Sequence, residues 1–254
     1  MSAPWETLPP PTVSGGTGGS GTRAVAEILT SAGLFMGSRL NGAGDSLDLA
    51  EVDWRWGQHY LAAALAGEMP PLQEMRTALE TGVANHLVQQ RPPGGSWGWK
   101  HPHSYLLLPW LDSVIPGLRF LHVVRDGRRM AFSGNQKQPQ HYGGIVFGAA
   151  AESWDPHVLS IRFWSWANER AADYGEQRMG RRYLCVRFED LCGDPQIACA
   201  RLLAFAQADD RPSTAAVAKA AELVHVPPAP TLEPSLMFEL ERHGSPGLRR
   251  FGYL

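Results

Sequence analysis

Ser14-Gly15-Gly16-Thr17-Gly18-Gly19-Ser20-Gly21-Thr22-Arg23 is the stretch of sequence that decides the fold. Glycines let backbone N–H groups approach an anion closely, and the N-terminus of a helix adds unpaired donors and a partial positive charge. Val13 precedes the run and an apolar helical pattern begins at Ala24, so a strand, a loop and a helix are expected in that order. The run therefore predicts a loop that holds a phosphate group.

The loop differs from the common nucleoside-triphosphate loop at the two positions that carry its chemistry. Gly16 and Gly21 have the G-x-x-x-x-G spacing, but Thr22 and Arg23 follow where that motif requires Lys and then Ser or Thr. The lysine that reaches the β- and γ-phosphates and the hydroxyl that holds Mg²⁺ are both missing. We therefore expect a phosphate ligand without a metal, and no metal site in the chain.

The composition is that of a globular protein with one sizeable core. The chain has 254 residues, of which 44% are hydrophobic and 19% charged, and its formal net charge is −2. This balance does not indicate a nucleic-acid partner, and no apolar run has the length of a membrane span. The N-terminus lacks the pattern of a secretory signal, and the cysteines, without a CxxC pair, are expected to be buried thiols: Cys185, Cys192 and Cys199. A cytoplasmic location is expected.

The order of the predicted elements indicates a single α/β domain over residues 1–254. Residues 1–11 are expected to be a Pro-rich, extended lead-in, and residues 140–157 a loop. Strands are predicted at 12–13, 96–99, 120–124 and 183–188, and a last short helix is expected to precede a basic, glycine-containing tail. Helices are predicted at 22–32, 54–65, 70–89, 105–111, 127–132, 159–179, 195–207 and 212–224. Strands separated by helices favour a central parallel sheet with helices on both faces, which is a three-layer domain.

A second candidate binding element begins where the strand at 120–124 ends. Arg125 follows this strand directly, at the position where ligands of open α/β sheets bind, and Ser133 comes eight residues later. Arginine offers a bidentate fork to a phosphate, and a hydroxyl adds a neutral donor. Taken alone, Arg125 and Asp126 are also typical of a surface pair that caps a helix.

These elements, in this order, resemble the sulfotransferases that use 3′-phosphoadenosine 5′-phosphosulfate, which share a fold like that of the phosphate-loop nucleotide hydrolases. The resemblance implies that the 5′-phosphosulfate is bound by the loop residues Gly18, Gly19, Ser20, Gly21, Thr22 and Arg23. It implies that Arg125 and Ser133 bind the 3′-phosphate. Arg242-His243-Gly244-Ser245-Pro246-Gly247 is similar to the family's C-terminal R-x-G-x-x-G pattern, which adds Arg242 and Gly244 to this site. A solvated basic tail is the competing interpretation of that pattern.

The resemblance also implies a place for the chemistry. Many members carry a loop lysine, and Gly19 stands at the equivalent position here. Lys100, in Trp97-Gly98-Trp99-Lys100-His101-Pro102-His103, is the natural replacement, because this segment resembles the family's Lys-x-His-x-Pro element. A histidine that titrates near neutrality can accept the acceptor's proton, and we rank His101 first and His103 second. Asp45 is third, by analogy with the heparan-type branch, which uses a carboxylate.

The acceptor of the sulfuryl group is expected to be a small molecule or a glycan. Several tryptophans flank the candidate segment; most are expected in the core, and some in an aromatic acceptor pocket: Trp54, Trp56, Trp97, Trp99, Trp154, Trp164 and Trp166. Two other classes stay open at this point. A small-molecule kinase would need the missing loop lysine, and a non-catalytic nucleotide-binding module would leave Lys100 and the histidines structural. The sequence does not indicate an oligomeric state.

Overall fold

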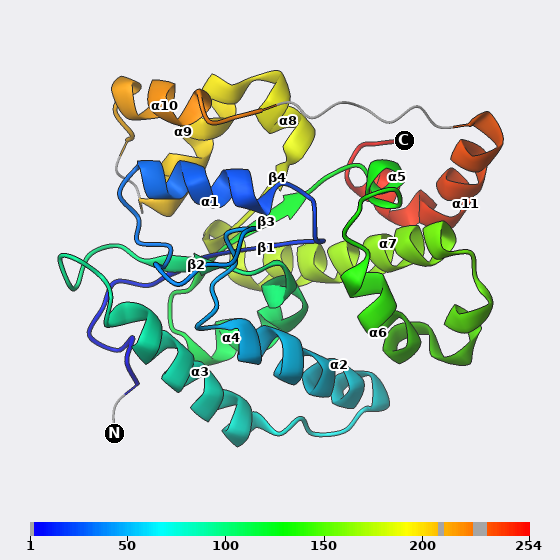
Figure 1. Cartoon of the computed structure of the whole chain (residues 1–254), viewed down its shortest axis with the longest axis horizontal. Coiled ribbons are helices and arrows are strands. Elements are labelled where there is room, and N and C mark those ends of the chain that lie inside the picture. Colours follow the sequence, from blue (N-terminus) through cyan, green and yellow to red (C-terminus); the bar gives the residue numbers. More distant parts are fainter. Residues whose placement is uncertain (1–2, 208–210, 226–232) are drawn as a thin grey trace.

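One parallel sheet of four strands lies at the centre of the computed structural model, which describes residues 3–207, 211–225 and 233–254. The strands are β1 (Thr12–Gly15), β2 (Gly98–Lys100), β3 (Arg119–Val124) and β4 (Tyr183–Arg187), in the order β2-β1-β3-β4 (Figure 1). Because all the pairings are parallel, the carboxyl ends of the four strands lie along one edge of the sheet. The predicted parallel α/β sheet is confirmed.

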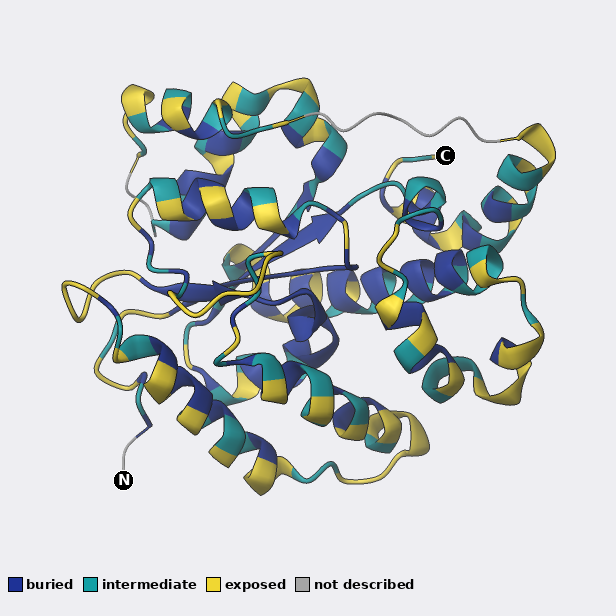
Figure 2. Cartoon of the chain, in the orientation of Figure 1, coloured by how far each residue is buried: buried dark blue, intermediate teal, exposed yellow. Residues whose placement is uncertain are grey.

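Helices cover both faces of the sheet and bury it (Figures 1 and 2). Side chains of β3 alternate between two apolar clusters: Leu121 and Val123 face one, Phe120 and Val124 the other. The first cluster is covered by α1 (Thr22–Ser31), α9 (Pro195–Ala206) and α10 (Thr214–Ala221). The second includes residues of α3 (Leu72–Leu87), α4 (Leu108–Val114) and α7 (Pro156–Tyr174). This arrangement is the predicted three-layer fold.

The remaining elements connect and flank these layers. The other α-helices are α2 (Gly57–Ala66), α5 (Gly127–Met130), α6 (Lys137–Phe147), α8 (Phe188–Gly193) and α11 (Pro234–Arg250). Five shorter segments form 3₁₀ or π turns: η1 (Val52–Trp56), η2 (Pro102–Leu107), η3 (Gly148–Ser153), η4 (Gly175–Met179) and η5 (Gly180–Arg182).

The segment 140–157 is not the loop that its glycine-rich composition suggests. Residues 137–147 form α6, and η3 follows it. Tyr142 of α6 is fully buried, and a Cβ added at Gly143 would lie 2.9 Å from Leu159 of α7. Tertiary packing of this helix thus outweighs the low helix propensity of its glycines.

Both ends of the chain also differ from expectation. Trp5, in the stretch expected to be an extended lead-in, is 5% exposed and belongs to the core, because a turn folds it back onto the protein. The expected short helix with a glycine-containing tail is instead the long helix α11. Gly244 and Gly247 lie inside α11, where a Cβ would meet Ile161 and Ser165 of α7 at 2.5 and 2.8 Å. Glycine is therefore needed there for the close approach of two helices.

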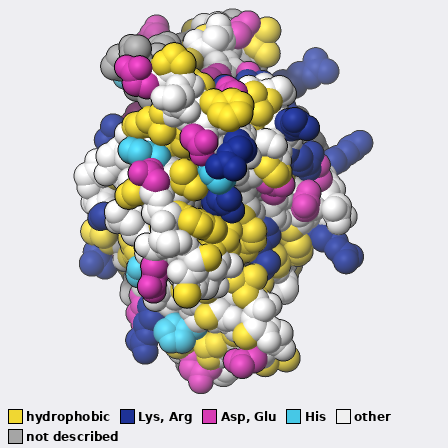
Figure 3. All heavy atoms as spheres, turned by 90° about the vertical axis from the view of Figure 1, so that its right-hand side faces the viewer, with side chains coloured by type: hydrophobic (Ala, Val, Ile, Leu, Met, Phe, Trp, Pro, Cys, Tyr) yellow, Lys and Arg dark blue, Asp and Glu magenta, His cyan; other side chains and the backbone are white. Residues whose placement is uncertain are grey.

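Charged side chains of both signs lie on the surface, and the cysteines are not paired in disulfides. The face shown in Figure 3 carries basic side chains interspersed with acidic ones. No helix within the described ranges has the length and apolar character needed to cross a membrane. All three cysteines are free thiols; Cys199 is buried as expected, whereas Cys185 and Cys192 are partly exposed.

Candidate active site

The glycine-rich loop joins β1 to α1, as its sequence predicts. Gly19 and Gly21 have positive φ angles of 95° and 103°, and a Cβ added at Gly21 would lie 2.2 Å from the Phe188 ring. Gly21 is also the N-cap of α1 and offers no side-chain cap, so the first N–H groups of the helix have no intrahelical partner. The loop thus presents backbone donors at a helix N-terminus, which is the chemistry of a phosphate site.

Two side chains from helices far along the sequence, on α6 and α7, donate hydrogen bonds to this loop. Gln138 Nε2 donates to the Gly16 carbonyl at 3.3 Å, and Asn168 Nδ2 donates to Thr17 Oγ1 at 3.0 Å. The Ser20 hydroxyl is buried in the loop and has no hydrogen-bond partner among the described residues. A buried hydroxyl without a partner is costly, so this atom is suited to a ligand that the loop encloses.

Arg125 and Ser133 both reach the loop, although they follow a different strand. Arg125 Nη1 donates to the Gly19 carbonyl at 3.3 Å, and its guanidinium lies 5.1 Å from the centre of the Phe188 ring. Ser133 Oγ is 2.7 Å from the place where a Cβ on Gly19 would stand. Ser133 lies just beyond α5, which is a single helical turn. The structure therefore brings the two predicted phosphate elements together.

Lys100 and Asp45 form a buried ion pair at the carboxyl end of β2. Lys100 is 2% exposed; its Nζ donates to the Ala43 carbonyl at 2.9 Å and to the Asp45 carboxylate. Burial lowers the pKa of Lys100, and the hydrogen bond and charge of Asp45 oppose that shift. Burial raises the pKa of Asp45, but hydrogen bonds from Lys100 and Asn41 outweigh it, and the net pKa is lowered. Asp45 thus carries a charge that its partners stabilise, which makes it a weak base.

Two adjoining cavities meet at this ion pair. The larger, of about 490 Å³, is lined by Gly19, Gly21, Thr22, Arg23, Ala24, Glu27, Ala43, Asp45, Lys100, Pro102, Asn135, Phe188, Leu223 and His225. The smaller, of about 170 Å³, is lined by Gly18, Asn41, Ala43, Asp45, Trp54, His101, Pro102, His103, Asn135 and Lys137. Both include Asp45 and Asn135. One cavity therefore contains the phosphate loop and the other contains both candidate histidines.

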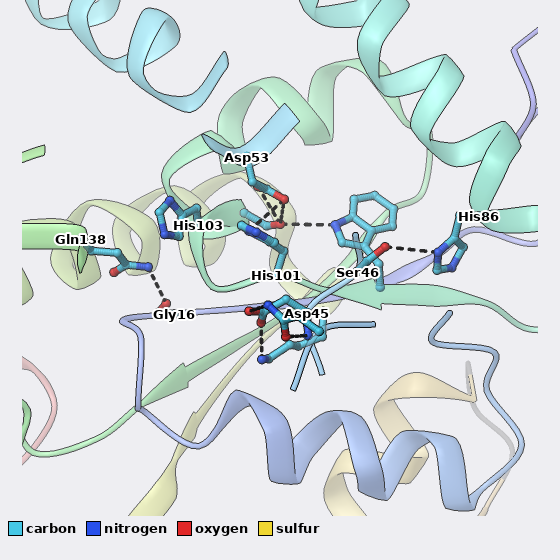
Figure 4. A network of polar contacts seen from close by, with 12 residues as sticks. Gly16, Asp45, Ser46, Asp53, His86, His101, His103 and Gln138 are labelled. Carbon is cyan, nitrogen blue, oxygen red and sulfur yellow. Dashed lines mark hydrogen bonds and ion pairs between the residues drawn. The ribbon is translucent and has the colours of Figure 1, made fainter. Parts of the chain in front are cut away.

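The two histidines are buried and have different partners. His101 Nδ1 lies 3.2 Å from an oxygen of Asp53, and Figure 4 shows Asp53 and Asp45 on opposite sides of the His101 ring. His103 Nδ1 lies 2.8 Å from the Tyr142 hydroxyl, whose proton is donated to the Asp53 carbonyl at 3.2 Å. Since that hydroxyl has only one proton, His103 Nδ1 must be the donor, and its Nε2 is left as an acceptor.

Burial keeps both rings neutral. It lowers the pKa of His101 to about 4; the charge of Asp45 opposes this shift and that of Lys100 adds to it. The pKa of His103 is also lowered by burial, with smaller contributions from His101, His141 and Lys137. A neutral imidazole with a free nitrogen in a small cavity is competent to accept a proton.

Comparison with known proteins assigns the family. The sequence profile of the sulfotransferase family matches residues 11–212, which is most of the chain. This chain belongs to the sulfotransferase family. No curated protein matches the chain significantly.

Solved sulfotransferase structures share the fold of this sulfotransferase. A sulfotransferase from Mycobacterium avium aligns with 15% identity and a TM-score of 0.53, over 96% of this chain and 77% of that one. The sulfotransferase domain from the curacin biosynthetic pathway aligns with 17% identity and a TM-score of 0.50, over 94% of this chain and 97% of that one. The predicted family is confirmed, and with it the activity class of a sulfuryl-transferring enzyme.

Arg242 and Gly244 lie in helix α11 of this sulfotransferase. Arg242 lies within α11, where its Nη2 donates to Glu239 at 2.9 Å, and Gly244 packs against Ile161. Neither residue lines the two cavities described above. The segment expected to be a glycine-containing tail is part of helix α11, where its glycines serve the packing of two helices.

Several site residues were not singled out from the sequence. Asn135 lines both cavities, and a Cβ on Gly18 would lie 2.6 Å from its Nδ2. Phe188 lies between Gly21 and Arg125. The position of Phe188 directly after β4 is the one available signal, because the carboxyl ends of all strands meet there. Nothing in the sequence spacing points to Asn135, whereas Asp53 lies in the region after the first helix where the heparan-type branch places its carboxylate.

Proposed function

We propose that this sulfotransferase takes 3′-phosphoadenosine 5′-phosphosulfate as donor and transfers the sulfuryl group to a hydroxyl or amine of a small molecule or glycan. One observation carries the proposal. The loop and Lys100, at the carboxyl ends of β1 and β2, line adjoining cavities with the histidines, and Arg125, after β3, contacts Gly19 of the loop. Anion binding and proton acceptance are thereby combined in one place.

The phosphate loop, which lines the larger cavity, and the residues that contact this loop fit such a donor. The loop offers backbone donors, the unpartnered Ser20 hydroxyl and the N-terminus of α1 to the phosphosulfate end. Arg125, whose Nε has no hydrogen-bond partner in the described part of the chain, and Ser133 offer further donors to the 3′-phosphate. The donor brings an activated sulfonate, whose bond to the phosphate oxygen breaks when the acceptor oxygen attacks.

Lys100 and a histidine supply the groups that act during transfer. In this proposal, Lys100 stabilises negative charge on the sulfonate and on the departing oxygen, which is the role of an electrostatic catalyst. The ammonium is paired with Asp45, so it is held at the junction of the two cavities. His101 accepts the proton of the acceptor, with His103 as the second candidate. No metal takes part in the proposed reaction.

The proposal extends to the cellular location of the enzyme and to its domain organisation. The three free thiols are compatible with a reducing compartment, and we place the enzyme in the cytoplasm on that ground. We further propose that residues 1–254 work as one catalytic domain, since a single sheet positions every group named above.

Isothermal titration calorimetry tests donor recognition directly. The proposal expects 3′-phosphoadenosine 5′-phosphate to bind in the presence of EDTA, and more tightly than ATP with Mg²⁺. Adenosine 5′-phosphate serves as the matched control that lacks only the 3′-phosphate. Binding that requires Mg²⁺ and prefers ATP would favour a phosphate-loop kinase and would refute the proposed donor.

A further inference from the structure

Asp53 is a fully buried carboxylate that the proposed reaction does not yet use. It lies on the π turn η1, its side chain is 2% exposed, and one oxygen is 3.2 Å from His101 Nδ1. Ser104 Oγ donates to both of its oxygens, at 3.0 and 3.2 Å. Burial raises the pKa of Asp53 well above its usual range and the charge of Asp45 adds to this shift, whereas the hydrogen bonds from Ser104 oppose it. A hydrogen bond from His101 Nδ1–H would likewise favour the charged carboxylate. Asp53 is therefore a buried carboxyl group with a perturbed pKa, and it lies within reach of the candidate base His101.

His101 Nδ1 has no aligned hydrogen bond, although the carboxylate oxygen is within reach. This nitrogen makes no hydrogen bond to any other group in the described part of the chain. The other charged or titratable groups facing His101 are Asp45, Lys100 and His103, whose ring centre is 5.2 Å away. Asp53 is thus the natural partner of Nδ1.

We propose that Asp53 and His101 form a dyad in which Asp53 holds the Nδ1 proton of His101 and directs its Nε2 to the acceptor. The inference rests on the proposed function. In the step, the acceptor oxygen forms a bond to sulfur while its proton passes to Nε2. The bond between sulfur and the bridging phosphate oxygen breaks, and its electron pair stays on that oxygen. The imidazolium that forms is stabilised by the Asp53 carboxylate, so Asp53 is a positioning residue.

The partners of the two histidines decide which of them is the base. His103 Nδ1 donates to the neutral hydroxyl of Tyr142, whereas His101 faces a carboxylate. A hydrogen bond to a charged group stabilises the protonated ring more than a neutral one does. The dyad therefore assigns proton acceptance to His101.

The dyad predicts a specific effect of Asp53→Asn on the pH dependence of single-turnover transfer. Loss of the carboxylate removes the group that favours the imidazolium, so the acidic limb shifts to lower pH. The plateau rate falls about 10- to 100-fold, while the affinity for 3′-phosphoadenosine 5′-phosphate stays within about twofold. Asp112→Asn is the matched control, because Asp112 on α4 is a largely buried carboxylate that is paired with Arg182. An unshifted acidic limb in Asp53→Asn overturns the dyad.

A double-mutant cycle with Asp53→Asn and His101→Ala distinguishes an effect that acts through His101 from a general structural effect. If Asp53 acts through His101, Asp53→Asn costs little further rate in a His101→Ala background. Additive losses overturn the inference, with folding of each variant checked by circular dichroism.

The histidine resonances of the free protein separate failure of the dyad from failure of the proposed function. NMR titration of His101 needs neither donor nor acceptor, and the dyad expects its pKa to fall in Asp53→Asn. An unchanged His101 pKa contradicts the dyad even if transfer is observed. A lowered pKa in a protein that neither binds the donor nor transfers sulfonate supports the pair and refutes the proposed function.

Discussion

Lys100 is one of the most deeply buried charged groups, and its ammonium serves both as a structural partner of Asp45 and as the proposed electrostatic catalyst. Charge on the departing oxygen develops mainly in the transition state, so the ammonium contributes more to turnover than to donor binding. We expect Lys100→Ala to lower kcat about 10²- to 10³-fold while the donor Kd changes much less. Rapid-quench kinetics combined with calorimetry separates the two quantities.

The control for Lys100→Ala is Lys219→Ala, which removes an exposed ammonium on α10. It should leave both kcat and Kd near their original values. Parallel losses of turnover and affinity in Lys100→Ala would mean that the residue only helps to bind the donor.

Arg125 is expected to contribute to the binding of nucleotides that carry a 3′-phosphate and not to the binding of those that lack it. Its side chain lies beside Gly19 and over the Phe188 ring. Arg125→Ala should weaken binding of 3′-phosphoadenosine 5′-phosphate about 10- to 100-fold, since a charge-assisted hydrogen bond of about 1.5–3 kcal/mol is lost. Binding of adenosine 5′-phosphate should hardly change. Arg119→Ala, at the opposite end of β3, is the control, and equal losses for both nucleotides would show that Arg125 is structural.

At the scale of the elements, the loop between β1 and α1 depends on the absence of a side chain at Gly21. Both Gly21 and Gly33 have positive φ angles, of 103° and 91°, but only at Gly21 would a Cβ collide with a neighbour, the Phe188 ring at 2.2 Å. We expect Gly21→Ala to abolish measurable nucleotide binding. Gly33→Ala should cost about 1 kcal/mol of stability through strain and leave binding intact. Calorimetry and urea unfolding on both variants test this, and normal binding in a folded Gly21→Ala variant would exclude the loop from the site.

The phosphate loop between β1 and α1 could be predicted from the sequence, whereas the helical structure around Arg242 and Gly244 could not. The phosphate loop, Arg125 and Lys100 each directly follow a predicted strand, and parallel strands bring their carboxyl ends together regardless of the details of packing. Arg242 and Gly244 matched a short pattern with no such constraint. The same glycine spacing serves helix packing against α7, which only tertiary contacts reveal.

The supporting residues could not be predicted for a related reason. Asn168 reaches Thr17 across 151 positions of sequence, and Asp53 reaches His101 from a π turn that periodicity does not distinguish from a helix. Such contacts depend on how the layers pack, and neither residue type nor spacing encodes them locally. Helix α6 was missed because burial of Tyr142 compensates for glycines that disfavour a helix.

For the whole molecule, neutral buried histidines link stability to pH. His122 is fully buried between the Tyr183 hydroxyl and the Asn168 amide oxygen, and burial lowers its pKa from 6.5 to about 4. Between these values the unfolded chain binds more protons than the native one, so the free energy of unfolding decreases as the pH falls from 6.5 to 4. His122 alone accounts for up to about 3 kcal/mol of that decrease.

Urea unfolding of wild type and His122→Gln across this pH range isolates the contribution of His122. The variant should be less stable than wild type near neutrality. Between pH 6.5 and pH 4, its free energy of unfolding should fall by up to about 3 kcal/mol less than that of wild type. Two curves that run parallel from pH 6.5 to pH 4 would show that His122 is not the linked group.

Transfer of a radiolabelled sulfonate from 3′-phosphoadenosine 5′-phosphosulfate, in the presence of EDTA, tests the central claim most directly. Wild type is incubated with a panel of phenols, primary alcohols, amines and oligosaccharides, and Lys100→Ala is run beside it. Wild type should give a labelled product with at least one acceptor class, at a rate that Lys100→Ala lowers about 100-fold or more. Binding of the donor without transfer to any acceptor class, or transfer that is equally fast in Lys100→Ala, would contradict it.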